Sequence, residues 1–346
     1  MGQSITHMSP PDELSPPCVI GVLGAARIAA EAITRPAAAM DGVRVGAIAA
    51  RDHGRAQRWA ADLGIPTAYG SYDQLIEDPS LDAIYIAAPN AVHGQWAIKA
   101  LHAGKHVLIE KPVAANALEA AAIVTAASET GLVAAEAFHY RYHPLMQHVI
   151  DLIARGDIGD IESIDGRFCC FLRRINDVRW KYSLGGGAVM DLGCYLIHFA
   201  RSIVGEEPVV THAKASRIGS RIDRRMTFTL SFPSSVEAKM LCSLCSLDAL
   251  DRRRQRLVTI RGSDGLLEID NPITPHEWGT VQVTDAKGAR WVRVPGKTTY
   301  THQLEAFLAA INGGCEMLTM GNDLIANMAI IDTVYQVAGM PTRQPL

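Results

Sequence analysis

The sequence predicts an α/β fold with two domains, a Rossmann domain with a doubly wound parallel sheet and a C-terminal α+β domain with a large open, mainly antiparallel sheet. Up to about residue 135, short apolar runs alternate with alanine-rich helical stretches, which is the pattern of βαβ units. From Val209 onward, apolar and polar residues alternate with a period of two, as in an antiparallel sheet with one buried face. The 346 residues are enough for two domains.

Each expected element follows from these patterns. In the first domain the buried strands are expected at residues 18–23, 43–49, 83–87 and 106–109. In the second domain we expect a helix over 144–155, a strand over 161–172, a helix after the glycines at 185–187, and helices over 301–312 and 322–337. The predicted division is a flexible tail (1–17), a dinucleotide-binding Rossmann domain (18–137), a substrate-binding and oligomerisation domain (138–320) and a C-terminal helix packing back on the Rossmann domain (321–346).

Composition narrows the class of partner. Charged residues make up 20% of the chain and the net charge is -3, so neither nucleic acid nor a membrane surface is indicated, and a small molecule is expected. No apolar run reaches the roughly 18 to 20 residues of a membrane helix. The seven cysteines show no paired framework, which predicts reduced thiols and a cytoplasmic protein. Cys242 and Cys245 lie three apart in a strand-like run and therefore on opposite faces, and no metal site is predicted.

A turn after the first strand is the candidate pyrophosphate site. Aligned on Gly-x-Gly-x-x-Gly/Ala, the chain has Gly24, Ala26 and Ala29, at the point where an apolar strand ends and a helix begins. Gly24, Ala26, Arg27 and Ile28 are therefore predicted to contact the cofactor at the helix N-terminus. The same residues also suit a tight turn in a fold that binds no cofactor.

The end of the second strand predicts NADP(H), with NAD(H) as the less favoured ligand. NAD enzymes usually carry an acid here, whereas this chain has Ala50 followed by Arg51, with Arg55 one helical turn later. Arg51 and Arg55 can pair with a 2′-phosphate. Two alternatives remain: Asp52 could take the ribose position, which would favour NAD, or the arginines could be solvated charges at a helix start.

Three further segments carry a resemblance. They are Pro89-Asn90-Ala91-Val92-His93, Glu110-Lys111-Pro112, and Gly185-Gly186-Gly187 followed by Asp191 and Tyr195. Together they resemble the Gfo/Idh/MocA (glucose-fructose oxidoreductase and inositol dehydrogenase) family over roughly residues 18 to 341. Within it the chain is most similar to the branch of dimeric dihydrodiol dehydrogenase, NADP-dependent sugar dehydrogenases and sugar ketoreductases. It departs from the usual pattern at Ala26 and at Val113.

The resemblance implies Lys111 as the catalytic lysine, Tyr195 as the acid/base and Asp191 beside it. It also implies a C-terminal sheet used to form a homodimer or homotetramer. The chemistry of the residues agrees, because hydride transfer to a carbonyl leaves an alkoxide that needs a proton donor and a positive charge. An adjacent Lys111 ammonium is expected to lower the pKa of the Tyr195 phenol. Asp191 and Tyr195, four apart on a helix, are expected to share one face.

Other polar residues are expected around this centre. Pro89, Asn90 and His93 lie at the same sheet edge, where contact with the nicotinamide ribose or substrate is expected, although an N-cap role for Asn90 is equally consistent. Glu110 joins the cofactor set through its place in the Glu-Lys-Pro turn. His198 is interpreted as a satisfied core residue. Substrate contacts are predicted for Arg141, Arg179, Trp180, Asp191 and Tyr195, a set that suits a polyhydroxylated ligand, with solvated loop charge as the alternative for individual members.

The predicted function is hydride transfer between NADP(H) and a sugar-like carbonyl or hydroxyl. Two alternatives are an NAD-retaining glycosidase and a non-catalytic NADP(H) sensor. The presence of Lys111, Asp191 and Tyr195 together argues against the sensor. A glycosidase would recycle its cofactor rather than consume it.

Overall fold

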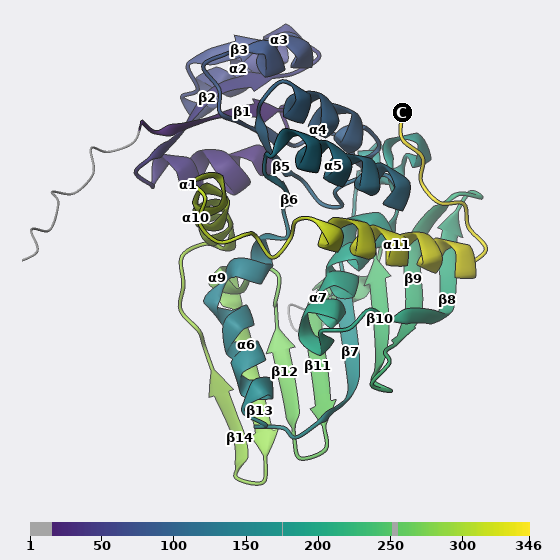
Figure 1. Ribbon diagram of the computed structural model, residues 1–346. Helices are drawn as coiled ribbons and strands as arrows, with labels where there is room; N and C mark the ends of the chain where they lie inside the picture. Colours follow the sequence, from purple (N-terminus) through teal and green to yellow (C-terminus); the bar gives the residue numbers. More distant parts are fainter. Residues whose placement is uncertain (1–15, 175, 251–254) are drawn as a thin grey trace, which may run out of the picture.

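The computed structural model describes residues 16–174, 176–250 and 255–346. The first 15 residues of the predicted flexible tail lie outside the described residues. Figure 1 shows two sheet-based domains, one above the other, with helices α10 (Thr299–Ile311) and α11 (Asn322–Val337) between them. Both predicted closing helices are therefore confirmed, with a start two residues earlier for α10.

The first domain is built on six parallel strands in the order β3-β2-β1-β4-β5-β6. This is the doubly wound Rossmann arrangement that the sequence predicts. The two edge strands were not predicted, because each has only three residues and shows no periodicity. The strands are β1 (Cys18–Leu23), β2 (Val43–Ala49), β3 (Thr67–Tyr69), β4 (Ala83–Ile86), β5 (His106–Ile109) and β6 (Ala134–Glu136).

The helices of this domain begin and end at residues suited to those places. Helix α2 starts after Asp52, whose carboxylate accepts a hydrogen bond from the Arg55 N–H, and ends at Gly64 with φ of 68°. Helix α5 is capped in the same way by Asn116. The helical segments are a π-helix (Ala30–Thr34) leading into α1 (Arg35–Ala38), α2 (His53–Leu63), α3 (Tyr72–Glu77), a 3-10 turn (Asn90–Val92), α4 (His93–His102) and α5 (Ala117–Thr130).

The second domain is an eight-stranded sheet in the order β14-β13-β12-β11-β7-β10-β9-β8. It is mixed but mainly antiparallel, as predicted, because only β7 and β10 run parallel. Its strands are β7 (Ile161–Cys169), β8 (Val209–Ile218), β9 (Ile222–Ser231), β10 (Glu237–Ser243), β11 (Arg256–Gly262), β12 (Leu266–Asp270), β13 (Thr280–Asp285) and β14 (Gly288–Val292).

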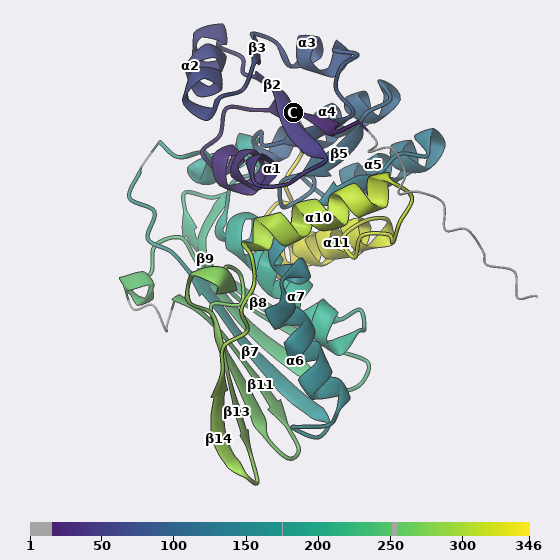
Figure 2. The ribbon, with the colours of Figure 1, turned by 90° about the vertical axis from the view of Figure 1, so that its left-hand side faces the viewer.

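Helices cover one face of this sheet. Figure 2 shows α6 (Pro144–Ala154) and α7 (Cys194–Val204) along the same side of it. Short helical turns complete the domain: His139–Tyr142, Val178–Trp180, Tyr182–Leu184, Leu247–Leu250 and α9 (Pro275–Trp278). On β9, Met226, Phe228 and Leu230 are buried in alternation, which confirms the period of two.

The segment Tyr182–Val204 corrects one expectation from the sequence. It is long and apolar enough to cross a membrane by length and composition, although no such run was expected. However, 83% of its apolar window is buried inside the protein. It contains helix α7 and packs into the core between the sheet and α11, which accounts for its hydropathy.

Two helices join the domains. Helix α11 packs against α5 of the Rossmann domain and against α7 and β8 of the second domain. Helix α10 packs against α1 and the preceding π-helix of the Rossmann domain, and also against the 3-10 turn His139–Tyr142 of the second domain.

The C-terminal tail, residues 340–346, follows α11 and runs along the seam between the domains (Figure 1). In it, Arg343 is fully buried and donates to Asp223 Oδ1 (2.8 Å) and to the Gly186 carbonyl (2.8 Å). Asn116 Nδ2 of the Rossmann domain donates to the Arg343 carbonyl (3.0 Å). The tail therefore ties the glycine turn at 185–187 to both domains.

Candidate active site

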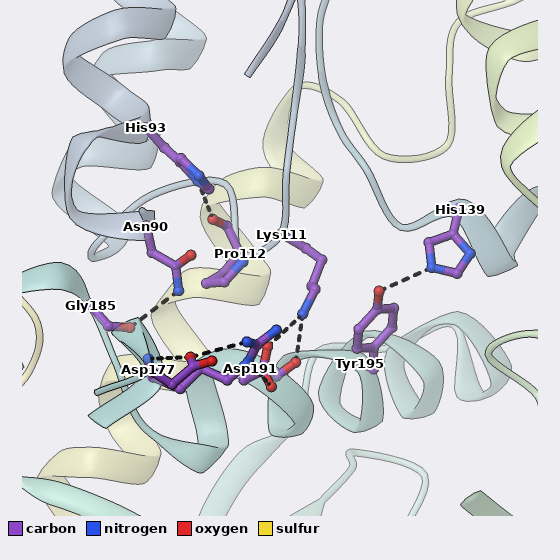
Figure 3. A network of polar contacts seen from close by, with 10 residues as sticks. Asn90, His93, Lys111, Pro112, His139, Asp177, Gly185, Asp191 and Tyr195 are labelled. Atoms are coloured by element: carbon purple, nitrogen blue, oxygen red, sulfur yellow. Dashed lines mark hydrogen bonds and ion pairs between the residues drawn. The ribbon is translucent and has the colours of Figure 1, made fainter. Parts of the chain in front are cut away.

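The candidate site lies where the carboxyl ends of the Rossmann strands meet the start of α7, and Figure 3 shows its polar contacts. Lys111 lies two residues after the end of β5, while Asp191 belongs to a π-helix (Val189–Gly193) that continues into α7. Tyr195 lies in the first turn of α7. Lys111 Nζ donates to the Asp191 carbonyl oxygen (2.7 Å) and to its Oδ1 (3.2 Å). The structure thus brings together the three residues predicted to carry the chemistry.

An ion network fixes the lysine. Arg179 Nε donates to Asp191 Oδ2 (2.7 Å), and Arg179 Nη1 donates to Asp177 Oδ1 (3.2 Å). The side chains of Lys111 and Asp191 are only 14% and 15% exposed. Burial alone would raise the pKa of Asp191, but the charges of Lys111 and Arg179 outweigh it and hold that pKa below its usual value.

Lys111 responds in the complementary direction. Burial alone would lower its pKa, but the Asp191 carboxylate more than compensates, so the pKa of Lys111 is raised. The pKa of Arg179 is also raised, chiefly by Asp191. Lys111 is therefore an ammonium ion at every pH near neutrality.

Tyr195 is buried with its ring beneath this ammonium. Lys111 Nζ lies 4.8 Å from the ring centroid, within the range of a cation–π contact. Burial raises the pKa of Tyr195 well above its usual value, and the neighbouring Tyr300 and Glu110 add to the effect. The expectation that Lys111 lowers this pKa is wrong for the structure described. The ammonium faces the ring and directs its hydrogen bonds to Asp191, so burial of the phenol dominates.

The hydroxyl of Tyr195 has a partner that sequence analysis missed. His139 Nε2 lies 3.1 Å from it, and His139 Nδ1 lies 2.8 Å from Thr299 Oγ1. His139 is in the 3-10 turn after β6 and is 3% exposed. No local signal marks it, because a histidine within Phe138-His139-Tyr140 resembles a core residue and its two partners are 56 and 160 residues away.

The turn between β1 and the first helix has a backbone shape that suits the binding of a dinucleotide cofactor. Gly24 adopts φ of 108°, and a Cβ there would lie 2.6 Å from the Ala87 carbonyl oxygen. Only glycine fits this position. The following residues, Ala26 and Ile28, are half-buried and Arg27 is exposed, so the turn opens to the outside. These residues fit a dinucleotide pyrophosphate held against backbone N–H groups.

Two arginines lie at the end of β2, beside this turn. Arg51 and Arg55 are both exposed, and Arg55 Nη2 donates to the Ala25 carbonyl (2.6 Å). Both charges act on Tyr72, whose pKa is nevertheless raised because burial dominates. Asp52 is occupied as the N-cap of α2, accepting from the Arg55 N–H at 2.6 Å. Arg51 and Arg55 are therefore exposed positive charges beside the turn.

The segment after β4 connects the two domains. Asn90 Nδ2 donates to the Gly185 carbonyl oxygen (3.2 Å). Pro89, not Asn90, precedes the helical turn as its cap residue and makes no side-chain cap bond, so the N-cap alternative for Asn90 is wrong. Asn90 instead places the glycine turn against the Rossmann edge, as Figure 3 shows.

His93 and Glu110 support the site through hydrogen bonds within the Rossmann domain. The His93 ring is fully buried, with Nδ1 2.9 Å from the Pro112 carbonyl and Nε2 2.8 Å from the Ala88 carbonyl. Both ring nitrogens thus face backbone rather than open space, which differs from the direct ligand contact that was expected. Glu110 accepts a hydrogen bond from the Tyr85 hydroxyl at 2.5 Å. Burial raises the pKa of Glu110.

The predicted substrate residues separate into two groups. Arg179 belongs to the Asp191 network, and Trp180, next to it, donates its indole N–H to the Arg174 carbonyl (3.1 Å). Arg141 lies in the 3-10 turn with His139, and its charge acts on Tyr140, Tyr142 and His198. Its contact with a substrate stays a prediction.

The interpretation of His198 as a satisfied core residue is confirmed. It is 1% exposed, its Nδ1 lies 2.6 Å from the Tyr140 hydroxyl and its Nε2 lies 3.3 Å from Asp323 Oδ2. Within the described ranges, no group of three or more His, Cys, Asp and Glu side chains could hold a metal ion.

Comparison with known proteins agrees with this geometry. Residues 18–138 match the oxidoreductase family with an NAD-binding Rossmann fold, and residues 146–268 match the GFO/IDH/MocA C-terminal domain. The D-xylose 1-dehydrogenase (NADP(+)) 2 of Haloferax volcanii is 33% identical over 323 residues, which cover 92% of this chain and 97% of that protein. The chain belongs to the GFO/IDH/MocA family. The resemblance inferred from the motifs is thereby confirmed.

Other GFO/IDH/MocA members are similar over most or part of the chain. A dTDP-3,4-didehydro-2,6-dideoxy-alpha-D-glucose 3-reductase of Streptomyces antibioticus is 29% identical over 94% of this chain and 98% of its own length. A trans-1,2-dihydrobenzene-1,2-diol dehydrogenase of Xenopus tropicalis is 34% identical over 56% of this chain and 59% of its length. A solved 3-ketoreductase from Actinomadura kijaniata, in complex with NADP and TDP-benzene, superposes with a TM-score of 0.84 at 26% identity, covering 92% of this chain and 97% of that one.

As a GFO/IDH/MocA member the chain is an NAD(P)-binding oxidoreductase that acts on hydroxyl or carbonyl groups of sugar-like substrates. This finding favours the predicted dehydrogenase or reductase over both the glycosidase and the sensor.

Proposed function

We propose that the protein transfers a hydride between NADP(H) and the carbonyl or hydroxyl of a sugar or sugar-like molecule, with Tyr195 as acid/base and Lys111 as its electrostatic partner. One observation carries the proposal. A buried ammonium, fixed by Asp191, lies over the ring of a buried tyrosine at the carboxyl edge of the Rossmann sheet. This is the edge at which open α/β sheets bind their ligands.

The ammonium retains a donor for the substrate. Two of the three N–H bonds of Lys111 go to Asp191. The third is left for the substrate oxygen, whose negative charge in the transition state it would stabilise. Because Tyr195 remains protonated, it can give its proton to that oxygen when a carbonyl is reduced. A bound nicotinamide supplies or accepts the hydride.

NADP(H) is the proposed form of the cofactor. Gly24, Ala26, Arg27 and Ile28 would hold the pyrophosphate, and Arg51 with Arg55 would pair with the 2′-phosphate. Ala50 supports this choice over NAD, since NAD enzymes usually carry an acidic residue at that position. NADP also appears with the xylose dehydrogenase and 3-ketoreductase relatives.

The substrate is proposed to be polyhydroxylated. Arg179 and Trp180 lie beside Asp191 and carry the polar and aromatic groups that suit a sugar ring, and Arg141 is proposed to approach from the 3-10 turn. The names of the relatives support this class, since they include a xylose dehydrogenase and a reductase of a nucleotide-linked keto sugar.

Assembly and location are also proposals. We propose a homodimer or homotetramer formed through the face of the eight-stranded sheet opposite α6 and α7 (Figure 2). Lys214, Thr227 and Lys239 belong to the residues that line pockets on this sheet. A cytoplasmic location is supported by seven free thiols.

The decisive test uses the purified full chain with NADP(H) and NAD(H) and a panel of aldoses, nucleotide-linked keto sugars and trans-dihydrodiols. We expect the absorbance of the reduced nicotinamide to change in proportion to product, with NADP(H) preferred. Product without a net change of cofactor would contradict the proposal and point to a hydrolase. Tight NADP(H) binding without turnover of any member of the panel would also count against it.

A further inference from the structure

The residue that carries this inference is His139, which the proposed chemistry does not use. Its ring bridges two hydroxyls, Tyr195 through Nε2 (3.1 Å) and Thr299 through Nδ1 (2.8 Å). Figure 3 shows His139 approaching Tyr195 from the side away from Lys111. A tyrosine oxygen can take part in more than one hydrogen bond, so the contact with His139 leaves Tyr195 able to contact a substrate as well.

The ring is held rigidly. It packs against Tyr300 with a centroid distance of 4.2 Å and against the edge of Tyr195 at 5.9 Å. Thr299 is fully buried at the start of α10, where Thr298 serves as the N-cap. The hydroxyl of Thr299 is therefore not needed for the cap and is available to the imidazole.

The surroundings favour the neutral form of the imidazole before the reaction begins. Burial lowers the pKa of His139 well below its usual value, and the charges of Lys111, His276 and Arg256 lower it further. The groups that face the ring are thus Tyr195 on α7, Lys111 after β5, Thr299 and Tyr300 on α10, His276 on α9 and Arg256 on β11. A neutral imidazole has one donor and one acceptor nitrogen, which matches its two hydroxyl partners.

We propose that His139 is the proton partner of Tyr195, exchanging a proton between its Nε2 and the tyrosine hydroxyl during the reaction. The inference rests on the proposed function, in which Tyr195 is the acid/base. His139 acts through Tyr195 rather than on the substrate itself.

The proton path balances in both directions. In oxidation the substrate O–H bond breaks and its proton binds to the Tyr195 oxygen, while the Tyr195 proton moves to His139 Nε2. The Nδ1–H of His139 donates to Thr299 Oγ1 throughout and spreads the added charge. The hydrogen and electron pair of the substrate C–H bond go to the oxidised nicotinamide, the oxidant of the family's reaction. In reduction the nicotinamide supplies the hydride, Tyr195 gives its proton to the substrate oxygen, and His139 then passes to Tyr195 a proton that it takes up from solvent.

The pair explains how a phenol with a raised pKa can still work. Without a partner, loss of a proton from buried Tyr195 would leave an unpaired phenolate. With His139, the hydroxyl proton has an acceptor already within hydrogen-bond distance. Tyr195 therefore does not have to form an unpaired phenolate in the buried site. Lys111 lies on the opposite side, with its ammonium over the Tyr195 ring.

The first test needs no activity. NMR of the full chain with ¹⁵N-labelled histidine, recorded without cofactor, reports the protonation state of each ring nitrogen. The His139 signals are assigned by their loss in His139→Gln. We expect Tyr195→Phe to shift the His139 Nε2 resonance and Thr299→Val to shift Nδ1. An Nε2 resonance that does not respond to Tyr195→Phe would overturn the proposal.

The second test separates proton exchange from simple packing. His139→Gln keeps a hydrogen-bonding group near Nε2 but cannot carry a proton, and His139→Phe keeps only the ring contact with Tyr300. On a substrate identified by the panel, we expect kcat to fall at least about tenfold in both variants, with KM little changed and an altered pH profile. His302→Gln, on the same helix as Thr299 but hydrogen-bonded to Glu305, is the matched control and should behave like wild type.

The experiments distinguish a failure of the inference about His139 from a failure of the proposed function. If His139→Gln retains the wild-type kcat and pH profile, His139 exchanges no proton and the inference is wrong. A wild-type chain without any turnover would instead overturn the proposed function, while the NMR experiment alone still decides whether Tyr195 and His139 form the pair.

Discussion

The two ends of the site differ in how their charges are surrounded. At the cofactor end, Arg51 and Arg55 are exposed at the end of β2. At the chemical end, Lys111, Asp191 and Tyr195 are enclosed, and the pKa of each departs from its usual value. Exposed charges are screened by water and salt, whereas enclosed charges act at a lower dielectric constant. The exposed end should therefore set which cofactor binds, and the enclosed end should set the rate.

The largest effect is expected from the fully buried ion pair that supports the enclosed end. Arg343→Met leaves Asp223 buried without its cation, which should lower the free energy of unfolding by about 3 to 5 kcal/mol. Urea and thermal unfolding would measure the loss. The control is Arg217→Met, which removes an exposed arginine that donates to the Ala338 and Gly339 carbonyls. An equally small loss of unfolding free energy in both variants would show that burial does not strengthen the Arg343–Asp223 ion pair.

The next effect concerns the rate. Tyr195→Phe should fold and bind NADPH normally but lose at least about a hundredfold in kcat, because only the acid/base hydroxyl is removed. Lys111→Met should fall at least as far, and the double variant should be scarcely worse, since the two residues act as a unit.

Tyr142→Phe is the control for this experiment. It removes a partly buried hydroxyl that contacts Thr319 Oγ1 (2.8 Å) outside the Lys111 network. More than about a third of wild-type turnover in Tyr195→Phe, with hydride transfer shown to be rate-limiting by a deuterium effect, would place the proton source elsewhere.

At the exposed end the effect should fall on affinity. Arg51→Ala should weaken NADP(H) binding by about 1.5 to 3 kcal/mol and leave NAD(H) binding nearly unchanged, because only NADP(H) carries the phosphate. Titration at low and high salt should show the difference shrinking as salt rises. Arg58→Ala, an exposed arginine of α2, is the control. Equal loss for both cofactors would contradict the assignment.

A smaller effect on stability is expected from a partly buried carboxylate. Burial raises the pKa of Asp332 on α11 to about 6, although its Oδ2 accepts from the Ala117 N–H at 2.9 Å. The carboxyl group of Asp332 thus keeps its proton in the folded protein at pH values where it would lose it in the unfolded chain. The stability that this proton contributes is lost as the pH rises from about 4 to about 6. Since the group is partly solvated, Asp332→Asn should stabilise the protein at pH 8 by only about 1 kcal/mol. A stability difference that does not narrow on acidification would disprove this linkage.

The sequence predicts those parts of the molecule that depend on local pattern. The four inner strands of the Rossmann sheet, the glycine at position 24, the Glu110-Lys111 turn and the Asp191 and Tyr195 spacing all follow from neighbouring residues. His139 could not be found in this way, because its role depends on Thr299 and Tyr195 meeting it across the fold. The predicted direction of the shift in the Tyr195 pKa was wrong for a related reason. Sequence spacing places a lysine near a tyrosine but gives neither the burial of the phenol nor the direction of the ammonium bonds.

The pairing of Arg343 with Asp223 has a consequence for synthesis. The two residues are 120 positions apart, so the ribosome completes the whole second sheet before the cation for Asp223 exists. Until then the carboxylate that also accepts from the Val189 N–H (2.8 Å) has no counter-charge, and the Gly186 carbonyl has no guanidinium to hold it. The first domain can fold while the chain is still growing. The glycine turn at 185–187 cannot make its contact with Arg343 until that residue has been added, so a nascent chain acquires its cofactor-binding fold well before the proposed active site is complete.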